Sequence, residues 1–244
     1  MLGRRVTVIA HRGAVTEAPE NTLKSFQRAI EMGADYVEFD VHFAKDGEIV
    51  VIHDEALKRT TGRPGKVHDF TASQLAEMDA GEGEHIPTLE EVIKLCNGQI
   101  KLQIEIKVKG IAQALISQLK NYEILENVLI SSFIHRELDA VKKIDFRIPC
   151  ATLDPTGSSW VTAWFGAKNV ILNAKGRHMD GTHPYYKILN REFVRRAHAA
   201  GLFVNPWTIN DPKIMPRLLD LGVDGLITNA PRALIGILED LHVR

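Results

Sequence analysis

Extended and helical segments alternate along this chain from one end to the other. Short runs rich in β-branched residues lie at 6–10 and 36–41, and residues 22–32 carry apolar side chains at helical spacing between them. Strands that alternate with helices predict parallel pairing through helical crossovers. The expected fold class is therefore α/β.

The segments fall into eight strand–helix pairs if residues 48–53 are treated as an extension beside the second strand. Eight such pairs in 244 residues favour a closed (β/α)8 TIM barrel over an open doubly wound sheet. No Gly-x-Gly-x-x-Gly pattern follows any expected strand, which argues against a dinucleotide-binding sheet. Further strands are expected at 100–108, 128–132, 148–153, 170–172, 202–207 and 225–228, and a helix is expected at 159–165.

No linker divides the chain, so residues 1–244 are expected to form a single barrel domain. Residues 54–87 are the one long interruption, rich in Gly, Thr and charge, and too short for an independent domain. We interpret them as a small insertion or capping segment after the second βα unit, because a loop of this length in a compact barrel usually serves function. A second loop is expected at 173–188, where it either tunes the choice of leaving group or is simply a surface loop.

The composition limits the partners and the location of the protein. A formal net charge of −1 argues against nucleic-acid binding, which requires a basic excess. No apolar run approaches the length of a membrane span, and no signal-peptide pattern precedes the first expected strand, so stable membrane insertion is not expected. Cys96 and Cys150 read as buried thiols, which favours a reducing compartment. We expect a cytoplasmic protein.

Three acidic residues are expected to point into the barrel. Glu38 and Asp40 are two residues apart on a strand and therefore share a face, and Glu105 and Lys107 repeat that spacing. Three converging carboxylates cannot all stay ionised without a compensating cation. One divalent cation with oxygen ligands, Mg²⁺, Ca²⁺ or Mn²⁺, fits this pattern. The alternative is an ion-pair network of the acids with Lys107 and Arg12.

Two histidines follow apolar strand-like runs, at the barrel end where active sites form. His11 precedes Arg12, and His53 precedes Asp54. Histidines in such places can act as an acid–base pair, and the guanidinium of Arg12 suits a phosphate. The alternative is that each histidine is a hydrogen-bonded structural residue.

Two other features carry two interpretations each. Trp207 is either a core residue or an apolar wall for the alcohol part of a substrate. In Glu20-Asn21-Thr22, Asn21 or Thr22 is expected to cap the first helix, and Glu20 or Asn21 is a candidate contact for the metal or the phosphate.

An ordered set of short motifs runs from residue 11 to residue 231 and covers nearly the whole chain. The set consists of His11-Arg12-Gly13, Glu20-Asn21-Thr22, Glu38-Phe39-Asp40-Val41, His53-Asp54, Arg59-Thr60-Thr61-Gly62, Ile86-Pro87-Thr88-Leu89-Glu90-Glu91, Glu105-Ile106-Lys107, Ser132-Phe133, Trp207-Thr208-Ile209-Asn210 and Gly225-Leu226-Ile227-Thr228-Asn229-Ala230-Pro231. Each motif alone is weakly specific, but the ordered set with these spacings is highly specific. On these motifs the chain resembles the glycerophosphodiester phosphodiesterase family.

The resemblance implies a (β/α)8 barrel with an insertion between the second and third units. It implies metal ligation by Glu38, Asp40 and Glu105, and acid–base roles for His11 and His53. It also implies phosphate contacts from Arg12 and Lys107. Many family members have Asp where this chain has Asn229, a change expected to alter a loop hydrogen bond without putting a catalytic role in doubt.

The expected function is metal-dependent hydrolysis of a small-molecule glycerophosphodiester, such as glycerophosphocholine or glycerophosphoethanolamine, to sn-glycerol 3-phosphate and an alcohol. The nucleophile is either water or the substrate's own hydroxyl, through a cyclic phosphate. Two alternatives remain: a lysophospholipase D or phospholipase C-like phosphodiesterase on the same barrel, and a non-catalytic barrel that binds phosphorylated ligands. A homodimer is one assembly that the sequence leaves open.

Overall fold

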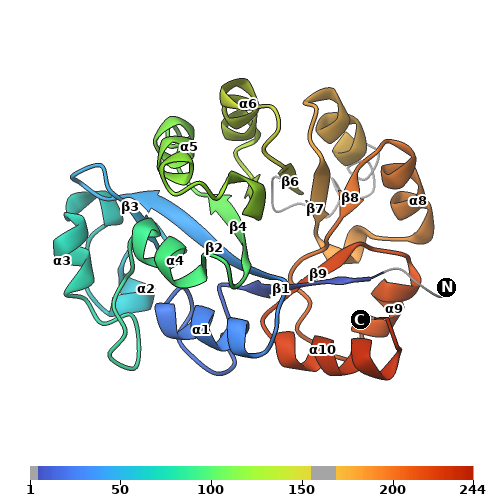
Figure 1. Ribbon diagram of the computed structural model, residues 1–244, viewed down its shortest axis with the longest axis horizontal. Coiled ribbons are helices and arrows are strands. Elements are labelled where there is room, and N and C mark those ends of the chain that lie inside the picture. The colour runs from blue at the N-terminus through green and yellow to red at the C-terminus, as the bar shows by residue number, and fades with distance from the viewer. Residues whose placement is uncertain (1–4, 155–168, 244) are drawn as a thin grey trace.

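The computed structural model describes residues 5–154 and 169–243, and in it parallel strands are surrounded by helices (Figure 1). Neighbouring strands pair in parallel register along the order β8-β7-β6-β5-β4-β2-β1-β9. The strands are β1 (Thr7–His11), β2 (Tyr36–Phe43), β4 (Lys101–Ile106), β5 (Val128–Ser132), β6 (Cys150–Asp154), β7 (Gly181–Pro184), β8 (Phe203–Val204) and β9 (Gly225–Thr228).

Hydrogen bonds between main-chain atoms bring the two ends of this sheet together. The amide of Asp224 donates to the carbonyl of Val204 at 2.9 Å, and the amide of Ile227 donates to the carbonyl of Pro206 at 3.0 Å. β8 and β9 are thereby neighbours, and the eight parallel strands form a (β/α)8 barrel. The expected fold class is confirmed.

The helices cover the outside of the strands because each presents one apolar face to them. In α1, Thr22 caps the helix by accepting from the amide of Ser25, and Phe26 packs against Phe39 of β2 with ring centroids 5.6 Å apart. The helices are α1 (Leu23–Glu31), α4 (Leu89–Cys96), α5 (Ala112–Asn121), α6 (His135–Ile144), a helix described over 169–176, α8 (Arg191–Ala199), α9 (Met215–Asp220) and α10 (Pro231–Asp240), with short 3-10 turns η2 (Leu125–Asn127) and η3 (Tyr186–Ile188).

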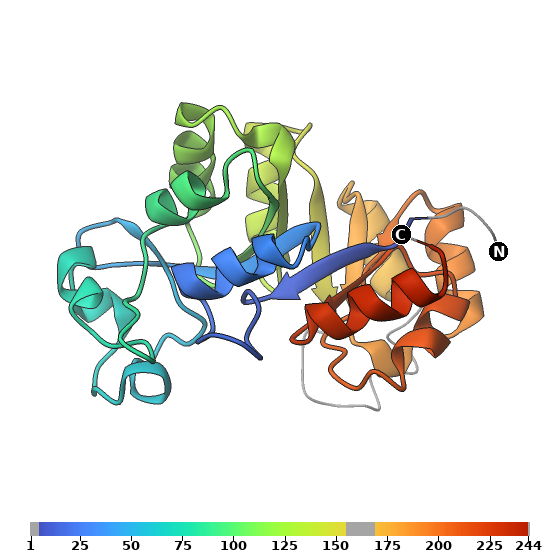
Figure 2. The ribbon, with the colours of Figure 1, turned by 60° about the horizontal axis from the view of Figure 1, so that its bottom comes forward.

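The insertion lies between β2 and α4 and projects from one side of the barrel (Figure 2). β3 (Ile49–Val51), which pairs antiparallel with β2, leads into it, and the insertion then contains α2 (Lys58–Thr61), η1 (Val67–Asp69) and α3 (Ala72–Ala76). A small apolar cluster of its own holds it together; this cluster includes Val50, Ile52, Leu57, Val67, Leu75 and Ile86.

One expected strand is wrong. Residues 170–172 belong to the helix described over 169–176, and the sixth strand of the barrel is instead β7, which lies inside the expected loop at 173–188. β7 has the sequence Gly-Thr-His-Pro and lacks a β-branched run, so its pattern resembles a loop. A Cβ atom at Gly181 would lie 2.2 Å from the ring of Phe203, so close packing with β8 requires glycine there. The helix expected at 159–165 lies outside the described residues.

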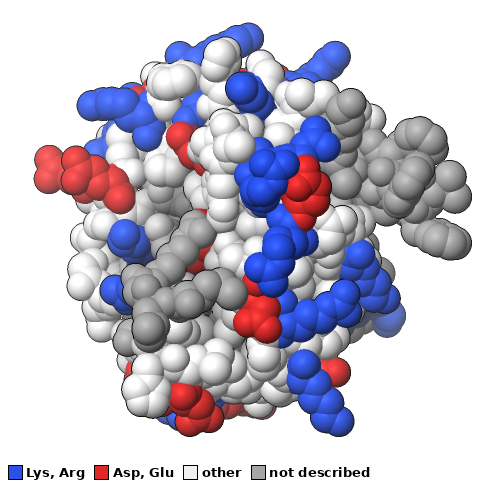
Figure 3. Space-filling model, turned by 90° about the vertical axis from the view of Figure 1, so that its right-hand side faces the viewer, with Lys and Arg blue, Asp and Glu red and all other residues white. Residues whose placement is uncertain are grey.

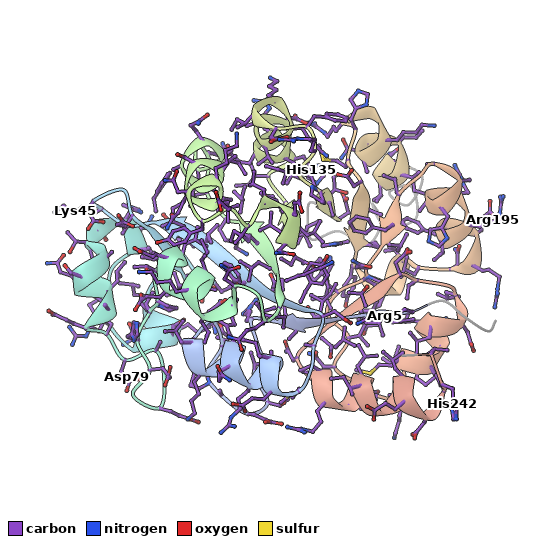
Figure 4. The ribbon with its side chains drawn as sticks, viewed as in Figure 1. Arg5, Lys45, Asp79, His135, Arg195 and His242 are labelled. Carbon is purple, nitrogen blue, oxygen red and sulfur yellow. The ribbon has the colours of Figure 1, made fainter. Side chains whose placement is uncertain are left out.

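Charges of both signs are mixed on the outer surface. Figure 3 views the side that carries α8 and α9, where Lys and Arg side chains form a band interrupted by acidic ones. Arg195, which points outward from α8 in Figure 4, is bonded to Glu192 at 2.7 Å. Lys45, in the turn between β2 and β3, and Asp79 of the insertion lie on the opposite side of the molecule. Among the described helices, none combines the length and the apolar character that a membrane crossing requires.

Candidate active site

A cavity of about 90 Å³ lies where the barrel strands reach their carboxyl ends. Active sites of this fold form at that end, since the βα loops converge there. Seven of the eight residues that the sequence singles out line it: His11, Arg12, Glu38, His53, Glu105, Lys107 and Trp207. The eighth, Asp40, is buried among them. Gln103 and Phe133 also line the cavity; Phe133 belongs to the Ser132-Phe133 motif, whereas no motif contains Gln103.

The three acids converge as expected. Glu38, Asp40 and Glu105 are 2%, 1% and 7% exposed, and each offers a carboxylate oxygen within 4.8 Å of the others. The register between β2 and β4 places Asp40 opposite Glu105. The alternating side chain of Phe39 packs outward on α1, which turns the acids toward the barrel axis.

Two cations and one amide contact these acids. Lys107 Nζ lies 2.8 Å from Glu105 Oε1 and 3.4 Å from Asp40 Oδ1, and Arg12 Nε lies 3.5 Å from Asp40 Oδ2. Asn21 donates through Nδ2 to Asp40 Oδ2 at 2.9 Å. Part of the ion-pair network that we considered as the alternative to a metal is therefore present.

The network leaves the three carboxylates with an excess of negative charge. Burial raises the pKa of Glu38 well above its ordinary value, with further contributions from Asp40 and Glu105, although Glu38 accepts the main-chain N–H of Arg12 at 3.0 Å. Burial and Asp40 raise the pKa of Glu105 to about 7. Burial alone would raise the pKa of Asp40, but the positive charges nearby, foremost Lys107, hold it below its ordinary value.

These residues fit a hard divalent cation. Asp40 Oδ1 is buried and receives no hydrogen bond from any described residue, although Lys107 Nζ lies 3.4 Å from it. Three carboxylates on two adjacent strands supply the oxygen ligands that Mg²⁺, Ca²⁺ and Mn²⁺ prefer. A dication would also offset the charge that raises the pKa of Glu38.

The two histidines have different partners at Nδ1. His11 Nδ1 lies 2.6 Å from Oδ1 of Asn229, a neutral amide, whereas His53 Nδ1 lies 2.6 Å from Oδ1 of Asp54. Burial, and then the adjacent Arg12, lower the pKa of His11 to about 4. Burial also lowers the pKa of His53, but the carboxylates of Asp40 and Asp54 oppose that shift.

Arg12 is held in an unusual backbone conformation. Its φ angle is +55°, in the left-handed region, and that of Asn21, whose amide donates to the Arg12 carbonyl at 3.0 Å, is +56°. Arg12 Nη1 also donates to Glu20 Oε1 at 3.1 Å. Strained backbone of this kind collects at functional sites. Thr22 thus caps α1, while Asn21 and Glu20 bind Asp40 and Arg12 respectively.

Trp207 forms one side of the cavity. Its Nε1 donates to the carbonyl of His183 at 2.8 Å, and its ring meets the edge of Phe133 with centroids 5.3 Å apart. Two contacts therefore fix the half-buried indole. The indole thus adds an aromatic surface to the cavity that the charged residues also line.

The fold and the site define a (β/α)8-barrel protein in which two histidines, three buried acids and two cationic side chains gather at the carboxyl ends of the strands. Residues 11–233 match the Glycerophosphoryl diester phosphodiesterase family. The chain belongs to this family, and it is an enzyme rather than a non-catalytic phospho-ligand-binding barrel.

Similar proteins span nearly the whole length of this one. A glycerophosphodiester phosphodiesterase of Caldanaerobacter subterraneus subsp. tengcongensis is 38% identical over 96% of this chain and 98% of its own. The crystal structure of a glycerophosphodiester phosphodiesterase from Thermotoga maritima has a TM-score of 0.81 at 31% identity, covering 96% and 99% of the two chains. An Oleispira antarctica phosphodiesterase, solved in complex with the product sn-glycerol-3-phosphate, has a TM-score of 0.82 at 28% identity over 96% of both chains.

Proposed function

We propose that the enzyme hydrolyses glycerophosphodiesters such as glycerophosphocholine and glycerophosphoethanolamine to sn-glycerol 3-phosphate and an alcohol, with the help of one divalent cation. The observation that carries this proposal is the position of three buried acids, with oxygens within 4.8 Å of one another, beside two histidines in one cavity. The sn-glycerol-3-phosphate held by the Oleispira antarctica neighbour supports the choice of product.

Glu38, Asp40 and Glu105 would hold the cation. When bound, Mg²⁺, Ca²⁺ or Mn²⁺ supplies a Lewis acid for the phosphate group. Three buried acids face two cationic side chains, and the charges of Asp40 and Glu105 add to the effect of burial in raising the pKa of Glu38, which supports the assignment.

His11 acts as the general base and His53 as the general acid. Nδ1 of His11 is bonded to a neutral amide and the ring is buried, which favours the neutral imidazole that accepts a proton from the nucleophile. His53 is bonded to the carboxylate of Asp54, which opposes the lowering of its pKa by burial and so helps the ring hold the proton that it donates to the departing alcohol. One P–O bond forms and one breaks. His11 gains the proton of the nucleophile, and His53 gives one proton to the departing alcohol.

Arg12 and Lys107 would stabilise charge on the phosphoryl oxygens, since both line the cavity and carry fixed positive charge. Trp207 would lie against the apolar part of the substrate. The nucleophile is either water or the glycerol hydroxyl beside the ester. Transient cyclic phosphate in a ³¹P NMR time course would identify the glycerol hydroxyl as the nucleophile.

The test is release of choline and sn-glycerol 3-phosphate from glycerophosphocholine by the purified protein. We expect release by the wild type and none by His11→Ala or His53→Ala, with circular dichroism unchanged. His68→Ala, at an exposed position in the insertion, is the matched control and should be fully active. Near-normal turnover in either active-site variant would contradict the acid–base roles. Release from a lysophospholipid but not from glycerophosphocholine would favour the lysophospholipase D alternative.

Three wider expectations belong to the same proposal. Residues 1–244 would act as one domain in which 54–87 caps the site. The buried, unpaired thiols of Cys96 and Cys150 suit a cytoplasmic enzyme. A homodimer remains a prediction that sedimentation equilibrium would test.

A further inference from the structure

β1 and β9 end side by side at the mouth of the barrel. Their register pairs Ala10 with Thr228, so the next residue of each strand path, His11 and Asn229, stands at the same level. The side chains meet there, with 2.6 Å between His11 Nδ1 and Asn229 Oδ1. The sequence separation of 218 residues is bridged by the closure of the barrel.

The main chain around Asn229 is fixed by its own hydrogen bonds. Its amide donates to Asn210 Oδ1 at 3.0 Å, and the amide of Ala230 donates to Thr228 Oγ1 at 2.9 Å. Asn210 is held opposite by the bond from the amide of Ile209 to the carbonyl of Ile227, at 3.0 Å. Asn229 therefore reaches His11 from an anchored turn.

We propose that Asn229 is a positioning residue that fixes the ring orientation and the tautomer of His11. The amide oxygen accepts a hydrogen bond from Nδ1–H, so Nε2 is the nitrogen that carries the lone pair. This inference rests on the proposed function, in which His11 takes a proton. Asn229 does not touch the substrate in this account; it acts through the imidazole.

His11 and His53 differ in the chemistry of their Nδ1 partners, an amide oxygen for His11 and a carboxylate oxygen for His53. A carboxylate can only accept a hydrogen bond, so it fixes the Nδ1–H tautomer and adds a negative charge. An amide oxygen fixes the same tautomer without that charge. The partner of a histidine nitrogen decides which ring nitrogen is free, so loss of the acceptor would let both tautomers and several ring orientations exist.

The first test compares Asn229→Leu, which removes the acceptor at similar size, with Asn229→Asp, which keeps it. We expect Asn229→Leu to lower kcat by about 10- to 100-fold with KM changed by less than about threefold, the usual scale for a residue that orients a functional side chain. Asn229→Asp should keep kcat within about fivefold of the wild type, because its acceptor preserves the tautomer. Asn121→Leu, at the far end of α5, is the matched control and should match the wild type.

The second test reads the tautomer itself. In ¹⁵N NMR spectra of histidine-labelled wild type, the His11 signals, assigned by their loss in His11→Ala, should show Nδ1 protonated. A protonated Nε2 in the wild type, or unchanged kcat in Asn229→Leu, would overturn the proposal. If Asn229→Leu does not fold, the wild-type spectrum and Asn229→Asp still decide it. Full activity of His11→Ala would instead reject the proposed function, which keeps the two failures distinct.

Discussion

Arg59 of the insertion reaches across to the barrel, and its Nη2 lies 2.6 Å from Glu20 Oε1. The same guanidinium bonds through Nε to Asp54, which in turn bonds His53. Glu20 also accepts from Arg12. One arginine in α2 therefore connects the surroundings of His53 with those of Arg12, which gives the insertion a direct part in ordering the site.

Replacing Arg59 should impair catalysis more than stability. Arg59→Ala leaves Asp54 free to turn away from His53, so we expect kcat to fall by about 10-fold. Arg59→Lys should recover only part of the loss, because an ammonium group cannot hold both carboxylates in the fork geometry of arginine. Steady-state kinetics give the result, with Arg63→Ala, an exposed neighbour in the insertion, as control. Equal activity of Arg59→Ala and Arg63→Ala would contradict the link.

Gly13 follows Arg12 directly, and replacing it with alanine should lower the free energy of unfolding more than the same replacement at Gly83. Gly13 has a φ of +87°, and an added Cβ would lie 2.3 Å from Ser25 Oγ and 2.8 Å from its main-chain carbon. Gly83 has a φ of +79° but no atom within 4 Å of an added Cβ. We expect Gly83→Ala to cost about 1 kcal/mol from strain alone and Gly13→Ala about 3 kcal/mol or more from strain and overlap. Similar unfolding free energies in urea would show that the turn at Gly13 is not tightly packed.

Much of this arrangement could be predicted from the sequence, because a barrel strand shows its inward residues as an alternation. Glu38 and Asp40 alternate with apolar residues that pack outward, so their convergence with Glu105 followed from spacing. β7 could not be predicted, since packing between Gly181 and Phe203, rather than propensity, makes it a strand.

The partner of His11 is the second feature that the sequence did not reveal. We expected the change at Asn229 to matter for a loop only, but the structure places this side chain on His11. The signal was available in principle, because the first and last strands of a closed barrel are neighbours. What the sequence lacks is the register that brings residues 11 and 229 to the same level.

Glu38 should lower stability in the absence of metal. Its carboxyl is buried and its pKa is raised well above the ordinary value, chiefly by burial, so ionisation near neutral pH is costly. Glu38→Gln removes that cost and keeps an acceptor for the Arg12 amide. We expect its Tm in EDTA to exceed that of the wild type by about 2–4 °C, while addition of the dication should raise the Tm of the wild type more than that of the variant. Glu192→Gln, an exposed acid, should change neither value. A lower Tm for Glu38→Gln in EDTA would reject this explanation.

Acid should destabilise the protein through buried histidine. Burial lowers the pKa of His183 to about 3 from 6.5, so between these values the unfolded chain binds a proton that the folded protein does not. Stability therefore rises with pH across this window and is lost as the pH falls below 6.5. His183 alone should contribute about 3 kcal/mol of loss between pH 7 and pH 4.5. Urea unfolding at both pH values should show that His183→Gln loses less unfolding free energy between them than the wild type. An equal loss would mean that other groups cause the acid destabilisation.

The measurement to make first is release of sn-glycerol 3-phosphate from glycerophosphocholine by metal-stripped protein, with and without Mg²⁺, Ca²⁺ or Mn²⁺, alongside Glu105→Gln. We predict no release without metal, restored release with at least one of the three ions, and a higher requirement for that ion in Glu105→Gln. Undiminished release by protein shown to be free of metal, or no release with any ion, would contradict a metal-assisted glycerophosphodiesterase at the Glu38, Asp40 and Glu105 site.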